Sequence, residues 1–203
     1  MNTNESEEVK NAQKGKRLSS HIAKYFWQAS ALSGSRKKSI HRFFRKIPEF
    51  NDFSDIELYT FSKYLHVREF EANEVVFHRN QAGLSFYMIY EGSVGITLEE
   101  KHQVLNPESD LKLIAELERY NYFGELSLLE EQNRRNAAAI SLRKATLLAI
   151  YKADLDEMIE EHSVVAAKFL KALSYIVAKR LQLVANELKV VKDKLKEKEI
   201  KDV

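Results

Sequence analysis

The chain has 203 residues, 44% hydrophobic and 31% charged, which suits one domain of ordinary size with additional segments. It contains no cysteine, which excludes disulfides and thiolate chemistry. No apolar run approaches the length of a membrane span, and the acidic N-terminus is unlike a secretory signal, so we expect a cytoplasmic protein. The net charge of +2 conceals an asymmetry, because residues 9–48 hold 11 Lys or Arg and no Asp or Glu.

The first 48 residues are predicted to form a tail and a basic arm. Residues 1–17 are polar and charged, which indicates a disordered tail. Residues 18–48 are predicted to be helical, with one helix over 18–32 and a short second helix over 39–46. Between them Ser33, Gly34 and Ser35 break the pattern, and Pro48 ends the second helix.

Residues 49–162 show first a helix and then many short strands. The helix is expected over 54–65, with Ser54 as its N-cap. Its inward residues are predicted to be Ile56, Leu58, Phe61 and Leu65. Alternating strands are predicted over 74–78, 85–90, 94–98 and 111–117, with two more within 138–150. Turn signals separate them at Gly83, Gly92 and Pro107, so we expect a small barrel or sandwich, followed by a short helix over 154–162.

Residues 163–203 contain neither glycine nor proline and are predicted to be one long helix. Apolar residues recur in steps of three and four, as in a heptad seam: Leu170, Leu173, Val177, Leu181, Val184, Leu188, Val191 and Leu195. The seam predicts a parallel coiled-coil homodimer through residues 170–195. The alternative is packing against the chain's own N-terminal helices, which suits the first half of the seam better than the second.

The most informative stretch is Phe123-Gly124-Glu125-Leu126, which follows a strand-like run and opens a short helix. Arg135-Asn136-Ala137 begins ten residues after Glu125. A glycine at a helix start lets backbone N–H groups approach an anion closely. A carboxylate beside it can accept a hydrogen bond from a sugar hydroxyl, and an arginine can hold a phosphate through two parallel bonds. The pattern therefore favours a small phosphorylated sugar.

This pattern resembles the phosphate-binding cassette of cyclic nucleotide-binding domains. The resemblance extends to residues 85–94 and 47–50 upstream and to Lys179-Arg180-Leu181-Gln182 downstream, which is similar to the long helix of catabolite activator proteins. It covers about residues 43–190. It implies an α+β fold, with an antiparallel, jelly-roll-like β-roll over 49–162 flanked by N-terminal helices and one long C-terminal dimerisation helix over 163–203.

The resemblance also implies roles for individual residues. Glu125 would contact the ribose hydroxyl and Arg135 the cyclic phosphate. Backbone groups would come from Gly124, Leu126 and Ala137, with a backbone or amide donor from Asn136. Ile96 and Ile114 would line the base pocket, unless they are plain core residues. Arg180 would reach the ligand from the long helix, unless it is a solvated helix charge.

Alternatives remain for the two charged cassette residues. Glu125 alone would be read as an acid that complements a helix dipole. A different cassette spacing would select Arg134 for the phosphate, but it would then place Arg135 and Asn136 where the family has small residues. We therefore expect Arg135 to meet the phosphate and Arg134 to be a solvated surface charge.

The chain departs from the family at two places. Catabolite activators carry a threonine and a serine that bond the adenine, where this chain has Val184 and Ala185, which cannot do so. Base recognition must therefore differ, come from Asn186, or be weak. The family's turn before the cassette usually contains glycine, but this chain has residues 118–121 without glycine, and Asn121 is predicted to take the unusual dihedral angles.

Three functions follow. The first is a sensor of cAMP or, less favoured, cGMP that signals through the C-terminal helix or the N-terminal arm to an unknown protein partner. The second is a dimeric adaptor with a degenerate pocket. The third is a binder of nucleic acid or anionic membrane through residues 10–46. The chain ends at Val203 without room for a helix-turn-helix, so DNA readout by that module is not expected. No metal-ligand spacing, cofactor motif or catalytic motif is present, so we expect no metal, no cofactor and no enzyme.

Overall fold

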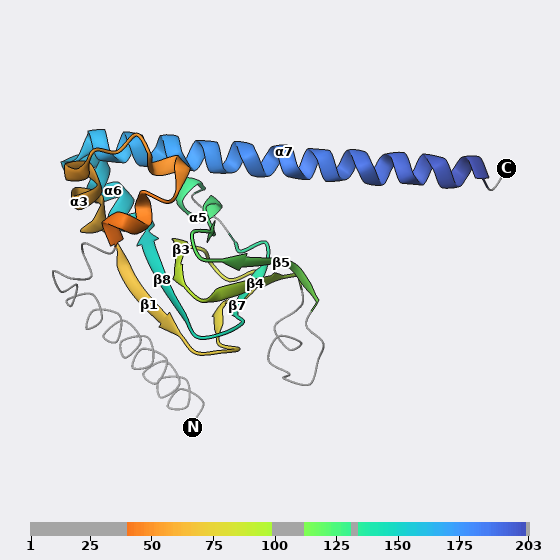
Figure 1. Cartoon of the computed structure of the whole chain (residues 1–203), viewed down its shortest axis with the longest axis horizontal. Helices are drawn as coiled ribbons and strands as arrows, with labels where there is room; N and C mark the ends of the chain where they lie inside the picture. The colour runs from red at the N-terminus through yellow and green to blue at the C-terminus, as the bar shows by residue number, and fades with distance from the viewer. Residues whose placement is uncertain (1–39, 99–111, 131–133, 202–203) are drawn as a thin grey trace, which may run out of the picture.

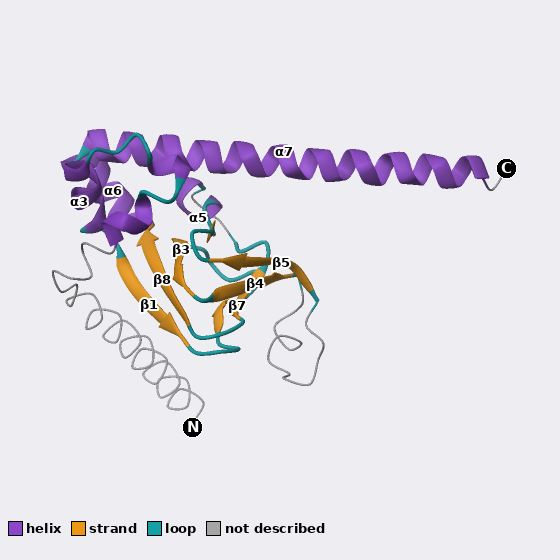
Figure 2. Cartoon of the chain, viewed as in Figure 1, coloured by secondary structure: helices purple, strands orange, loops and turns teal. Residues whose placement is uncertain are grey.

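The computed structural model describes residues 40–98, 112–130 and 134–201, and for residues 195–201 it describes the backbone alone. Predictions for the tail over 1–17, the helix over 18–32 and the turn at Pro107 lie outside these residues. The strands lie on one side of the long C-terminal helix, and the short helices gather near the start of that helix (Figure 2). None of the helices within the described residues has the length and apolarity needed to cross a bilayer. The predicted α+β β-roll with a long C-terminal helix is confirmed.

The β-roll consists of two four-stranded antiparallel sheets. One has the order β1-β8-β3-β6 and the other β2-β7-β4-β5. Their strands are β1 (His66–Phe70), β2 (Val75–Phe77), β3 (Ser85–Glu91), β4 (Ser93–Thr97), β5 (Leu113–Glu118), β6 (Tyr122–Phe123), β7 (Ala138–Ser141) and β8 (Ala145–Tyr151). Strand β3 joins β8 on one side and β6 on the other, so the strand leading into the cassette is tied to the centre of the first sheet.

Period-two alternation explains how the central strands serve two cores. In β3, Phe86 and Met88 belong to a core shared with the helices, whereas Tyr87 and Ile89 belong to a second core inside the roll. In β8, Leu148 and Leu147 divide in the same way. Both strands are therefore buried on both faces, which is why their sequences are continuously apolar.

The helical layer is built from short helices near both ends of the described chain (Figure 1). Its elements are a helical turn over 40–44, the 3-10 helix η1 (Pro48–Phe50), α3 (Asp55–Ser62), α6 (Lys152–Glu161) and the start of α7 (Ser163–Lys201). Phe43 and Phe44, from the predicted basic arm, are 1% and 0% exposed and lie in the same core as the domain. This placement agrees with the packing alternative for these two rings.

Helix α3 begins where the sequence predicts. The Ser54 hydroxyl accepts a hydrogen bond from the Glu57 N–H at 3.3 Å, and the Ser54 N–H donates to the Glu57 carboxylate at 2.7 Å, which completes a capping box. The inward position of Ile56 was predicted wrongly, because its side chain is 79% exposed. Leu58 and Phe61 lie on the buried side of α3, and Ile56 lies on the opposite side. The helix ends at Ser62 and not at the predicted Leu65, which is buried beyond the helix end.

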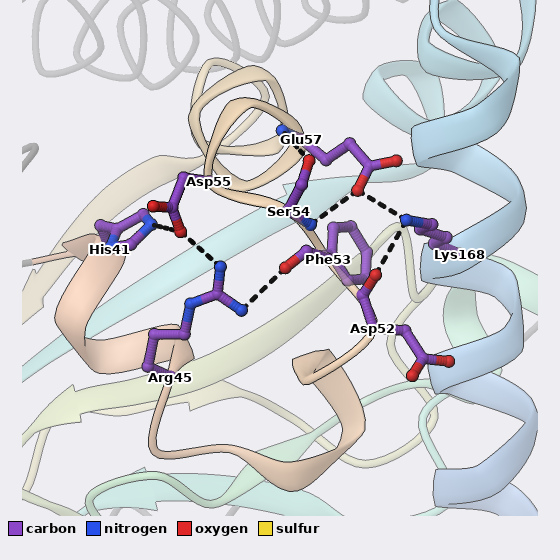
Figure 3. Close-up of polar contacts among 8 residues, drawn as sticks. All are labelled: His41, Arg45, Asp52, Phe53, Ser54, Asp55, Glu57 and Lys168. Atoms are coloured by element: carbon purple, nitrogen blue, oxygen red, sulfur yellow. Dashed lines mark hydrogen bonds and ion pairs between the residues drawn. The ribbon is translucent and has the colours of Figure 1, made fainter.

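Ion pairs tie α3 and the turn that precedes it to α7, and Figure 3 shows those of Lys168. Lys168 donates to the Glu57 carboxylate at 2.6 Å and to the Asp52 carbonyl at 2.8 Å, and Lys171 pairs with the Asp52 carboxylate at 2.6 Å. The hydrogen bond from Lys168 and that from the Ser54 N–H lower the pKa of Glu57 from its ordinary 4.5 to about 2. The charged form of Glu57 therefore stabilises the folded state.

This depressed pKa predicts an acid sensitivity. Because the folded pKa lies below the unfolded one, the stabilisation is complete above pH 4.5 and is lost as the pH falls from 4.5 toward 2. The free energy of unfolding should fall less between pH 5 and pH 3 in Glu57→Gln than in the wild type, as measured by urea denaturation. Glu160→Gln, at an exposed acid on α6, should keep the wild-type slope. Equal slopes in Glu57→Gln and the wild type would contradict the role of this pair.

Candidate functional site

The cassette turn is formed by backbone dihedral angles that favour glycine. Gly124, between β6 and α5 (Leu126–Leu129), has a φ of 80°. A Cβ at this position would lie 2.5 Å from Nη1 of Arg135 and 3.0 Å from the carbonyl oxygen of Ser85. The absence of a side chain therefore lets the guanidinium of Arg135 approach the turn closely.

Gly124→Ala should disturb both the backbone and Arg135. The left-handed conformation costs a non-glycine residue about 1–2 kcal/mol, and the guanidinium must move away from the new methyl group. Gly92→Ala is the matched control, because Gly92 has a φ of 88° and its Cβ would meet Lys144 away from the cassette. We expect both variants to lose stability in urea denaturation, Gly92→Ala the more because its new Cβ meets the backbone, but ligand binding to weaken only in Gly124→Ala. Intact binding in that variant would show that Arg135 need not lie against the turn.

Arg135 is anchored by its backbone and buried by its side chain. Its N–H donates to the Gln81 carbonyl at 2.9 Å, and its carbonyl accepts from the Asn80 N–H at 2.8 Å. The residue is only 6% exposed. Its guanidinium lies 4.0 Å from the centroid of the Phe77 ring, so the cation is stacked on an aromatic face.

The guanidinium of Arg135 links the cassette helix to the first sheet. Nη1 donates to the Ser127 hydroxyl at 2.5 Å, and Nη2 donates to the Ser85 carbonyl at 2.8 Å and the Ser85 hydroxyl at 3.1 Å. Both serines are buried. All of these partners are neutral, so they orient the cation without neutralising its charge.

Among the residues that the structure describes, Arg135 is therefore a buried cation without a counter-ion. Its Nε has no hydrogen-bond partner, and within the described part of the chain the residue forms no ion pair. Burial lowers the pKa of this guanidinium, which the nearby charge of Glu125 partly offsets, yet an arginine stays protonated. A buried charge of this kind is costly unless it is paired. The guanidinium of Arg135 therefore offers a binding site for an anion.

Glu125 is paired with the long helix. Nη1 of Arg180, from α7, lies 2.7 Å from each oxygen of the Glu125 carboxylate, and its Nη2 donates to the Tyr122 carbonyl. Glu125 is 4% exposed, whereas the Arg180 side chain is 38% exposed. The alternative of Arg180 as a solvated helix charge is therefore wrong. The pair connects α7 directly to the cassette.

These groups surround one cavity of about 390 Å³, within the range of about 300–1,000 Å³ that small-molecule sites occupy. All nine predicted site residues line it: Ile96, Ile114, Gly124, Glu125, Leu126, Arg135, Asn136, Ala137 and Arg180. Ile114 is 58% exposed, so its alternative as a core residue is wrong, whereas Ile96 also packs against the core inside the roll. Among the described residues, neither Arg134 nor Asn186 lines the cavity.

Other cavity residues escaped the sequence analysis. Ser127 and Phe77 also line the cavity, and Ser85 lies behind Arg135. Ser127 follows Glu125 by two residues, so its nearness to the motif was a usable signal. Phe77 and Ser85 carry no such signal, because only the packing of β2 and β3 brings them to the guanidinium. From α7, Leu183 and Val184 complete the wall.

Comparisons with known proteins agree with this geometry. The family model for the cyclic nucleotide-binding domain matches residues 67–162. The cAMP-dependent protein kinase regulatory subunit of Mycosarcoma maydis is 28% identical over 115 residues, which are 56% of this chain and 20% of that protein. The chain spans less than a third of the curated relatives that it matches.

Solved structures show the same fold. The catabolite activator protein of Thermus thermophilus matches with a TM-score of 0.58 at 23% identity, covering 71% of this chain and 63% of that one. A cyclic nucleotide-binding domain from Methylobacillus flagellatus matches with a TM-score of 0.62 at 18% identity, covering 75% and 82%. The β-roll, the cassette and the matched family model lead to one conclusion. Residues 67–162 match the cyclic nucleotide-binding domain family, and their fold is that of its solved members.

Proposed function

We propose that the chain is a sensor, not an enzyme, that binds a 3′,5′-cyclic nucleotide in this cavity, with cAMP favoured over cGMP. The observation that carries the proposal is the buried, unpaired cation of Arg135 on a cavity wall that also presents the Glu125 carboxylate. A cyclic phosphodiester is a monoanion. The charged residues that line the cavity are Glu125, Arg135 and Arg180, so their sum is one positive charge, which complements that anion.

Each wall has a role in this proposal. Arg135 binds the cyclic phosphate, assisted by backbone groups of Gly124, Leu126 and Ala137 and by Asn136. The carboxylate of Glu125 accepts a hydrogen bond from the ribose hydroxyl while Arg180 keeps it charged and oriented. Ile96 and Ile114 contact the base.

The signal is proposed to leave the site through α7, to a protein partner that we do not identify. Arg180 contacts Glu125 and the Tyr122 carbonyl, while the Tyr122 hydroxyl donates to the Glu49 carboxylate at 3.1 Å. Burial raises the pKa of Tyr122, and the adjacent Glu49 raises it further, so this hydroxyl stays protonated. The contacts join the cavity to α7 and η1, so a ligand that favours one position of Arg180 shifts both elements.

Dimerisation along α7 is part of the proposal. Leu173 is fully buried in the chain's own core, whereas Leu181, Val184 and Leu188 are 68%, 60% and 59% exposed. The first part of the predicted seam therefore packs within the chain, as the alternative had it. We expect the exposed residues in the later part of the range 170–195 to pair with a second copy in a parallel coiled coil, giving a dimer at micromolar concentration in sedimentation. Leu188→Lys should weaken the dimer, whereas Asp193→Lys, at an exposed position on the outer side of the predicted coiled coil, should not. A monomeric wild type would contradict the seam.

Calorimetry separates the sensor from the adaptor. The sensor predicts submillimolar binding of cAMP or cGMP to the full chain, lost in Arg135→Ala. Silence with both nucleotides would support the adaptor, which is favoured by the apolar Leu183 and Val184 at the cavity. Binding of nucleic acid or membrane by the arm over 10–46 would instead be lost on removal of residues 1–38.

A further inference from the structure

The cavity has two chemically different parts. Polar and charged side chains are contributed by the cassette and α7: Glu125, Ser127, Arg135, Asn136 and Arg180. Only apolar side chains are contributed by β4, β5 and the next turn of α7: Ile96, Ile114, Ala115, Leu117, Leu183 and Val184. A ligand whose phosphate and sugar meet the first part therefore presents its base to the second.

The apolar part offers the base edge few hydrogen-bond partners. None of its side chains carries a donor or acceptor. The backbone of Ile96 is already engaged, because β4 pairs Ile96 with Ala115 of β5 on one side and with Ala139 of β7 on the other. The backbone of Leu183 and Val184 belongs to the continuous helix α7. Ile114, Leu183 and Val184 are 58%, 57% and 60% exposed, so a base placed here is only partly removed from water. Its polar groups that meet the wall lose water without gaining an equal partner.

We infer that this wall selects the base by the cost of removing its polar groups from water, and that none of the described side chains of the wall reads the exocyclic groups. The inference rests on the proposed function and assigns specificity to Ile96, Leu183 and Val184. Guanine carries a carbonyl, a ring N–H and an amine at this edge, whereas adenine carries one amine and one ring nitrogen acceptor, so guanine loses more. The affinity should therefore rise as the polarity of the base falls. The unsubstituted purine compound should bind at least as tightly as the adenine compound, and the guanine compound should bind most weakly.

A series of four cyclic monophosphates tests this order by calorimetry on the full chain: those of purine riboside, adenosine, inosine and guanosine. We expect the purine compound to match cAMP within about twofold and cGMP to bind severalfold more weakly, since the exposed wall imposes only part of the cost of burying an unpaired polar group. Tighter binding of cAMP than of the purine compound by about tenfold would reveal a hydrogen bond to the amine and overturn the inference. Equal or tighter binding of cGMP would also overturn it. Silence with all four would overturn the proposed function with it, whereas binding in another order would overturn the selectivity alone.

A matched pair of variants tests the wall itself. Val184→Thr keeps the size of the side chain and adds a hydroxyl to the apolar part, whereas Val190→Thr makes the same change on α7 at a residue that is 53% exposed and does not line the cavity. We expect Val184→Thr to narrow the ratio between the purine compound and cGMP severalfold, and Val190→Thr to leave it unchanged. If the ratio of the affinities for the purine compound and cGMP stayed the same in Val184→Thr, Val184 would have no part in base selectivity. The oligomeric state of each variant is measured alongside, so that a change in dimerisation is recognised.

Discussion

Arg135→Ala is expected to weaken cyclic-nucleotide binding by at least about tenfold, because a charge-assisted hydrogen bond to a phosphate is worth roughly 1.5–3 kcal/mol. The side chain is buried, oriented by Ser85 and Ser127, and has no counter-ion in the described part of the chain. Arg135→Lys keeps the charge but loses the planar fork, so it should restore only part of the affinity. Calorimetric titration of cAMP into each variant measures the effect.

Arg134→Ala is the matched control, since this neighbouring arginine is exposed and donates to the Asn80 carbonyl outside the cavity. The Arg134→Ala variant should bind cAMP with an affinity close to that of the wild type. The fold of Arg135→Ala is checked by circular dichroism, because Ser85 and Ser127 lose a partner. A folded Arg135→Ala protein that binds as tightly as the wild type, or a loss in Arg134→Ala instead, would assign the phosphate to another group.

Phe169→Ala should produce the largest loss of stability, about 3–5 kcal/mol in the free energy of unfolding. Phe169 is fully buried and its ring lies against those of Phe50, Phe61 and Phe86 at centroid distances of 6.3, 4.9 and 6.0 Å. These rings come from η1, α3 and β3, so the substitution leaves a cavity where the helical layer meets the first sheet. Urea denaturation monitored by circular dichroism measures the change.

Val164→Ala provides the comparison on the same helix, because Val164 is 63% exposed and should change the free energy of unfolding by no more than about 0.5 kcal/mol. A loss in Phe169→Ala as small as that in Val164→Ala would mean that the start of α7 does not hold the helical layer together. The long helix would then be attached mainly through its ion pairs with Asp52 and Glu57.

Local sequence signals predicted much of the fold. The capping role of Ser54 and the course of α7 depend on neighbours within one or two helical turns, and the structure confirms both. Long strands such as β3 and β8 were visible as apolar runs between turn signals. The cassette residues were predictable because Gly124 and Arg135 are separated by a short segment whose two ends meet at the same turn.

Features that depend on packing between distant segments were not predictable. Ile56 is apolar but exposed, because the face of α3 that is buried is set by the helices and rings it meets. The turn before the cassette takes its positive φ of 73° at Tyr120 and not at the predicted Asn121. The Tyr120 ring stacks on Phe43 with a centroid distance of 5.2 Å. From the sequence alone, a positive φ would be expected at an asparagine and not at a tyrosine, so this packing contact with a distant segment was not predictable.

The site shows the same division. The pairing of Arg180 with Glu125 joins residues 55 positions apart and becomes visible only once α7 is placed beside the cassette. The sequence indicated that both residues face the ligand but not that they face each other. Leu183 entered no prediction, although it lines the cavity with Val184, because its neighbourhood is set by where α7 crosses the roll.

A crystal structure of the full chain grown with cAMP tests the central claim most directly. The account predicts the cyclic phosphate within hydrogen-bond distance of the Arg135 guanidinium, the ribose hydroxyl on the Glu125 carboxylate, and the base beside Val184. An empty cavity at saturating cAMP, or a nucleotide bound with its phosphate away from Arg135, would contradict it.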